Sequence, residues 1–197
     1  MTPWEHNREL TADRLIQVAN LIVAGRNAAL DRNDPSLGCD PWTIGCEAFA
    51  FQKFRIYEAA EHLDWLEILN PNMEFVFAIG GVPVRFYRGD PAEPHERALR
   101  QTFAELGQES LFADDELMRD EVSILYRFAV ETDLDGSLAQ ISFVALAGAT
   151  PLLTWPIPLG TPVIRVAPLR ATKSEGVEIP SPRVSPKSDN RRTETGD

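Results

Sequence analysis

The chain has 197 residues, of which 44% are hydrophobic and 25% charged, and its formal net charge is −11. This length fits one ordinary domain, and this composition is typical of a soluble globular protein. No apolar run approaches the roughly 20 residues that span a bilayer, and the N-terminal residues lack the basic and apolar regions of a signal peptide. We therefore expect no membrane association and a cytoplasmic location.

The negative charge lies in residues 1–169, where 13 Lys and Arg stand against 25 Asp and Glu, a balance of −12. A body of this charge repels nucleic-acid phosphates, so we expect no direct nucleic-acid binding. Residues 170–197 are rich in Pro, Ser and charges of both signs and contain no aromatic residue. We expect a single α+β domain over residues 1–169 and a disordered tail over residues 170–197.

A first helix is expected over residues 11–33. Thr11 is a suitable N-cap, and apolar residues then recur at helical spacing. Gly25 interrupts this apolar stripe, which indicates either close packing against another backbone or a weak point in the helix.

A central helix is expected from Ile44 to Leu69. Asp40-Pro41 before it and Asn70-Pro71 after it are typical of a helix start and a helix stop. Its apolar residues point in several directions, which is typical of a helix buried on more than one side.

A β-hairpin is expected over residues 73–88, with Gly80-Gly81 as its two-residue turn. Pairing Ile79 with Val82 places the large apolar residues of both strands on one face. Pro83 predicts an edge position for the second strand, because proline cannot donate a hydrogen bond to a neighbouring strand.

The rest of the chain predicts a third helix and a set of antiparallel strands. The expected elements are a helix at about 94–106, a short helix around 114–119, strands at 121–132, 138–147 and 151–159, and a short strand at 163–166. This pattern predicts an α+β fold in which two N-terminal helices, a hairpin, a third helix and an antiparallel meander form one curved sheet around the central helix. The order is similar to the cone-shaped fold of the nuclear-transport-factor-like superfamily, a resemblance that implies a curved sheet around helices, often with a pocket.

One polar stripe on the central helix is a candidate catalytic site. Arg55, Glu58 and His62 are spaced so that they share one side of a helix. In a pocket, His62 would act as a general base oriented by Glu58, and Arg55 would hold an anionic substrate. The alternative is an exposed salt bridge beside a hydrogen-bonded histidine, and we favour it because catalysis needs more partners than a lone carboxylate–histidine pair.

A second candidate site lies on the hairpin, where Arg85 and Tyr87 point to the face opposite the large apolar residues. These side chains would bind a carboxylate or a phosphate. The alternative, which we favour, is a diagonal cross-strand pair between Arg85 and Glu74.

Metal sites and cofactors are not expected. Cys39 and Cys46 form neither a CxxC pair nor a disulfide framework, and we expect free thiols. The sequence has only three histidines and no glycine-rich phosphate loop, GxSxG or HExxH motif.

The leading functional hypothesis is a non-catalytic binding protein that engages a protein partner or self-associates as a homodimer. The alternative is a metal-independent lyase, isomerase or hydrolase that uses His62 with Glu58. A further alternative is an acidic decoy that mimics DNA and competes for a basic protein.

Overall fold

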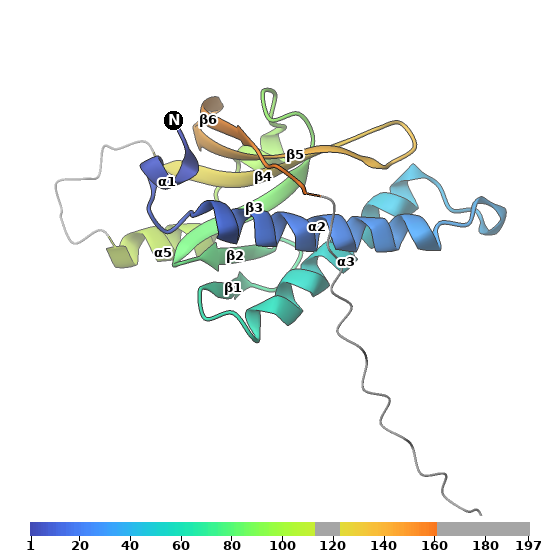
Figure 1. Ribbon diagram of the computed structural model, residues 1–197, viewed down its shortest axis with the longest axis horizontal. Helices are drawn as coiled ribbons and strands as arrows, with labels where there is room; N and C mark the ends of the chain where they lie inside the picture. Colours follow the sequence, from blue (N-terminus) through green and yellow to red (C-terminus); the bar gives the residue numbers. More distant parts are fainter. Residues whose placement is uncertain (113–122, 161–197) are drawn as a thin grey trace, which may run out of the picture. The chain divides into compact units, whose positions relative to one another are not determined.

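A helical hairpin opens the fold. In the computed structural model, which describes residues 1–112 and 123–160, helices α2 (Ala12–Arg32) and α3 (Pro41–Ala60) pack along each other (Figure 1). A short helix, α1 (Pro3–His6), precedes them, and a 3-10 turn (Pro35–Leu37) joins them.

The starts of both long helices are fixed by side-chain caps. The Thr11 side chain accepts a hydrogen bond from the Arg14 backbone at the start of α2. The Asp40 carboxylate accepts one from the Thr43 backbone at 2.8 Å, and Pro41 is the first residue of α3. Both caps satisfy backbone N–H groups that have no partner within the helix.

Gly25 marks the point where the two helices come closest. A Cβ atom at this position would lie 2.5 Å from the Gln52 backbone nitrogen, so a larger residue would force the helices apart. The buried Gln52 side chain donates to the Ile22 carbonyl at 3.2 Å, which ties the helices together at the same level. Of the two interpretations of Gly25, the structure shows close packing against another backbone.

The predicted extent of the central helix is wrong at its C-terminal end. The helix ends at Ala60, and residues Leu66–Asn70 form strand β1. The reason is tertiary, because β1 supplies hydrogen-bond partners to the free edge of β2 (Val76–Ile79), with Leu66 opposite Ile79. The apolar residues of this stretch fit either period, so local pattern did not distinguish the two.

The sheet has six strands in the order β1-β2-β3-β4-β5-β6. The remaining strands are β3 (Val82–Arg88), β4 (Ile124–Thr132), β5 (Leu138–Ala147) and β6 (Thr150–Pro156). All neighbouring strands are antiparallel except β3 and β4, which are parallel. The structure thus confirms an α+β fold with one mostly antiparallel sheet, and a parallel pair is added where the chain crosses from β3 to β4.

The predicted hairpin register is confirmed, with Ile79 opposite Val82 and Phe77 opposite Val84. The expected edge position of its second strand is wrong, because β3 is bonded on both sides. The parallel pairing with β4 begins at Val84, so it leaves out Pro83 and needs no N–H from it.

The third helix is divided in two, and the expected helix over 94–106 is wrong in this respect. Helix α4 (Glu96–Leu99) ends before Arg100, and α5 (Phe103–Phe112) begins after Thr102. The expected short helix around 114–119, the short strand at 163–166 and the tail over 170–197 lie outside the described residues.

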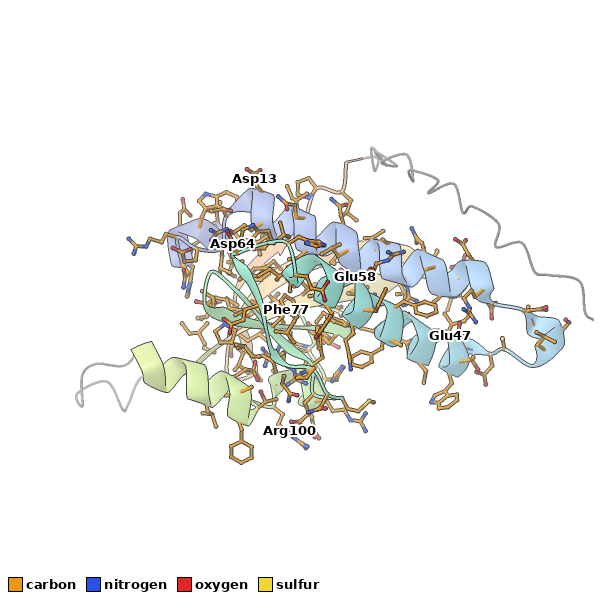
Figure 2. The ribbon with its side chains drawn as sticks, turned by 90° about the horizontal axis from the view of Figure 1, so that it is seen from below. Asp13, Glu47, Glu58, Asp64, Phe77 and Arg100 are labelled. Atoms are coloured by element: carbon orange, nitrogen blue, oxygen red, sulfur yellow. The ribbon has the colours of Figure 1, made fainter. Side chains whose placement is uncertain are left out.

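Side chains alternate between two faces of the sheet. The inner face packs on α2 and α3 through a large apolar core that includes Phe77, Phe128 and Phe143. The outer face packs on α4 through a smaller cluster that includes Tyr87, Leu125 and Val144 together with Ala98 of α4. In Figure 2, Asp13 on α2 and Arg100 beside α5 lie on opposite sides of Phe77.

Within residues 1–112 and 123–160, the structure contains no helix that meets the length and apolarity needed to cross a bilayer.

Candidate binding surface along helix α3

Helix α3 carries an apolar stripe that its own fold does not cover. Trp42, Cys46, Ala50 and Phe54 follow at intervals of four residues, with Tyr57 three residues further, and all five are exposed. Trp42 is 76% exposed. At 1.5 Å per residue this stripe, which we call the α3 stripe, is roughly 22 Å long.

A hollow of about 530 Å³ lies between α3 and the ends of β3 and β4. Its wall consists of one side of α3, Phe86 on β3, Val130 on β4 and Met73 from the loop between β1 and β2. Met73 is 81% exposed, so this loop presents a second large apolar side chain opposite the α3 stripe. We call this space the α3 hollow; its volume falls in the range of typical ligand sites.

Three cationic side chains line the α3 hollow, one from each surrounding element: Arg26 of α2, Lys53 of α3 and Arg88 of β3. The other residues that line it are neutral, so no carboxylate is among them. This is unexpected in a chain with a net charge of −11.

Arg26 is the most buried of the three, with 2% of its surface exposed. Its Nε donates to the Gly136 carbonyl at 2.7 Å, and its Nη2 donates to the same oxygen. Burial lowers the pKa of the Arg26 guanidinium, and the positive charge of Arg88 lowers it further, whereas Asp135 opposes these effects.

Arg88 and Lys53 lie around the same space. The Arg88 guanidinium lies beside α3, where its Nη1 would be 3.9 Å from a Cβ atom added at Gly45. The Lys53 Nζ lies 5.9 Å from the centre of the Phe75 ring, a cation–π distance. Within the described residues, no carboxylate lies within 4.0 Å of Arg26, Lys53 or Arg88.

Carboxylates lie on the far side of Arg88. A neighbouring depression is lined by Arg88 together with Asp90, Glu131 and Asp133. The surface is therefore divided at Arg88 into an apolar, cationic hollow and an acidic depression.

The three candidate residues of the central helix do not form a pocket. Arg55 Nη1 lies 3.3 Å from Glu58 Oε2 in an exposed ion pair. His62 is exposed in the turn after α3, and its backbone donates to the Ala59 carbonyl. The exposed pair of Arg55 and Glu58 is the salt bridge that we favoured from the sequence. The catalytic role of His62 and Glu58 stays a prediction, and this geometry does not support it.

Arg85 and Tyr87 lie on strand β3, and the Tyr87 side chain packs in the outer-face cluster while the residue also contributes to the lining of the α3 hollow. Arg85 Nη1 donates to the Arg100 carbonyl at 2.9 Å and lies 3.8 Å from Glu105 Oε2. The Tyr87 hydroxyl donates to the Asp90 carbonyl at 3.1 Å. Burial raises the pKa of Tyr87 to about 12, with a smaller contribution from the charges of Asp90 and Glu131. The sheet therefore separates Arg85 from Glu58 and His62.

A buried ion pair on the outer face was not foreseen. Arg127 is fully buried, and its Nη1 lies 2.5 Å from Oε1 of Glu105, which is 2% exposed. The Arg127 Nε donates to the Ala98 carbonyl at 2.9 Å. Arg127 is the parallel neighbour of Arg85, so Glu105 faces two guanidinium groups. Burial lowers the pKa of Arg127, and Glu105 opposes that shift.

A sequence signal for Glu105 was available. Thr102 and Glu105 form the T-x-x-E pattern of a capping box, and Glu105 Oε2 accepts a hydrogen bond from the Thr102 backbone at 2.8 Å. The pattern predicts the start of α5 but not its ionic partner, because Arg127 is 22 residues further along the chain.

Other chemistry is sparse in the described part of the chain. Cys39 and Cys46 are free thiols. Residues 1–112 and 123–160 contain no group of three or more His, Cys, Asp or Glu placed to hold a metal ion.

Comparison with known proteins adds no family to this geometry. No protein-family model matches the chain, and no curated protein or solved structure is similar to it.

Proposed function

We propose that this chain is a non-catalytic protein-interaction domain that docks an apolar segment of a partner protein along the α3 stripe and over the α3 hollow. The main support for this function is the row of exposed apolar side chains on α3, together with the exposed Met73 on the wall of the hollow. A helix that is stabilised only by its own fold presents polar residues to solvent, so an exposed apolar stripe indicates a partner.

The residue types support this function. Trp, Tyr, Met and Arg are enriched at protein interfaces, and Trp, Tyr and Arg are the types most often found among the residues that carry most of the binding energy. All four types occur on this surface, as Trp42, Tyr57, Met73 and Arg88. The two small residues between Trp42 and Phe54, Cys46 and Ala50, leave room for a partner helix to approach α3 closely.

Charge adds a preference to this surface. Glu47, Glu58 and Glu61 border the α3 stripe along its other edge, and the chain as a whole carries −11. A partner with basic residues on the side that meets these glutamates would associate faster than one with acidic residues there. Self-association is the other form that the same interaction would take.

The test compares two double variants of the full chain. Trp42→Ala/Phe54→Ala removes two of the three aromatic side chains of the α3 stripe, and Phe103→Ala/Leu152→Ala removes exposed apolar side chains elsewhere as a matched control. Molar mass is measured by light scattering, and partners are captured quantitatively from the native cells. We expect the control to keep the partner or the dimer of the wild type, and the α3 variant to lose it.

The proposal is wrong if the α3 variant retains the interaction in full. It is equally wrong if the wild-type chain is monomeric and the wild type and the control variant capture no common partner. Melting curves of both variants show whether a loss of binding reflects a loss of the fold.

A further inference from the structure

We infer that the α3 hollow is a binding site for a small amphipathic carboxylic acid, whose carboxylate pairs with Arg26, Lys53 and Arg88 and whose apolar body lies against Phe49, Phe86 and Met73. This inference goes beyond the proposed interaction with a protein and does not depend on it.

Arg26 is a buried charge that forms no ion pair among the described residues, and Asp135 acts on it only from beyond 4.0 Å. Charged groups in protein interiors are normally paired, because transfer of an unpaired ion out of water is costly. Arg26 is almost fully buried, yet its Nε and its Nη2 both donate to one neutral carbonyl, that of Gly136. Within the described residues, no carboxylate lies within 4.0 Å of it.

Three cations from α2, α3 and β3 line the α3 hollow, and Arg88 is close enough to Arg26 for its charge to lower the pKa of Arg26. Like charges held together at one site destabilise a fold unless an anion joins them. Arginine binds carboxylates through paired, charge-assisted hydrogen bonds, which suits a carboxylate better than a neutral polar group.

The remainder of the wall is apolar. Aromatic and aliphatic side chains cover most of the α3 hollow, including Trp42, Phe49, Phe86 and Met73. A small inorganic anion would leave this surface wet, whereas an acid with an aromatic or branched aliphatic body covers it.

The carboxylates near the site set its selectivity. Asp90, Glu131 and Asp133 line a depression next to Arg88, and Asp133 and Asp135 line a smaller one together with Arg26 and Arg88. They disfavour a ligand that carries several negative charges and extends past Arg88. We therefore expect a single carboxylate with an uncharged body.

The test is a calorimetric titration of the full chain with three probes of one shape: 4-phenylbutanoate, 4-phenylbutan-1-ol and 4-phenylbutylamine. We expect 4-phenylbutanoate to bind with a Kd of about 1 mM or below, given its size. The alcohol should bind at least about tenfold more weakly because it lacks the charge-assisted hydrogen bonds, and the amine weaker still.

Two variants on different elements locate the site. Arg88→Gln and Lys53→Gln should each weaken 4-phenylbutanoate binding several-fold and leave binding of the alcohol unchanged. Arg97→Gln removes the same charge from the exposed surface of α4 and should change neither. Circular dichroism confirms that each variant is folded.

The inference is overturned by any of three results. These results are no saturable binding of 4-phenylbutanoate to the wild type, equal binding of the acid and the alcohol, and a loss of acid binding in Arg97→Gln as large as that in Arg88→Gln. Because no protein partner is present in the titration, its failure does not affect the proposed interaction function.

Discussion

Two groups of cationic side chains lie on opposite faces of strand β3, and they have opposite environments. Arg85, on the outer face, shares the carboxylate of Glu105 with Arg127. Arg88, three residues later, faces the α3 hollow with Arg26 and Lys53, where the described residues provide no carboxylate within 4.0 Å. The outer group is completed by the chain itself, which makes it structural, and the inner group is open to a ligand.

The difference shows why charge alone is a poor guide to a site. Both groups contain buried arginines, and burial lowers the pKa of Arg26 and of Arg127 alike. Only the position of the nearest carboxylate separates them, and that position depends on tertiary contacts.

The largest expected effect follows from removal of the carboxylate of the outer group. Glu105→Gln would leave the fully buried Arg127 without its counter-charge and would weaken the cap at the start of α5. Breaking a buried pair in this way costs about 3–5 kcal/mol of unfolding free energy. Urea denaturation measures this loss, and a change of less than about 1 kcal/mol would show that the outer group is not a tightly coupled pair.

A pH titration tests whether water reaches Tyr87 on the outer face of the sheet. Burial raises the pKa of Tyr87 to about 12, from the ordinary value of 10.0. The unfolded chain therefore loses this proton first, so stability conferred by Tyr87 is complete below pH 10 and falls as the pH rises towards 12. Absorbance of the phenolate, compared with Tyr87→Phe, should show one tyrosine that ionises late. Ionisation of Tyr87 near its ordinary value would mean that water reaches it.

Neutralisation of the inner group should have little effect on the fold. Arg88→Gln removes one of the neighbouring positive charges and breaks no ion pair of the described residues, so we expect the free energy of unfolding to change by less than about 0.5 kcal/mol. The measurement is the same urea denaturation. A loss as large as that from Glu105→Gln would mean that Arg88 has a structural role, and the contrast between the two groups would not hold.

An effect of similarly small size is expected at the exposed ion pair of α3. Glu58→Gln breaks the exposed pair with Arg55, and exposed pairs contribute about 0.2–1 kcal/mol. Thermal melting should detect a shift of a degree or two at most, which a high salt concentration should remove. A larger, salt-independent loss would indicate that this pair is held by contacts other than its charges.

Local signals in the sequence predicted local structure well. The caps at Thr11 and Asp40 mark the helix starts, and the alternation around Gly80-Gly81 predicted a register that the structure confirms. These features depend on contacts between residues close together in the chain.

The features that were missed depend on contacts over long distances in the sequence. Strand β1 was expected to be helical. Its extended conformation depends on pairing with β2, which the local sequence pattern does not show. The inner group could not be predicted, since its three cations come from three elements and neither their convergence nor the distance to the nearest acid has a sequence signature.

The most direct test of the contrast is an NMR titration of the arginine Nε–Hε signals with 4-phenylbutanoate. The signals of Arg26 and Arg88 should shift in a saturable way, while those of Arg85 and Arg127 stay in place. Unchanged Arg26 and Arg88 signals, or an equal shift of Arg127, would contradict the assignment of one cationic group to the fold and the other to a ligand.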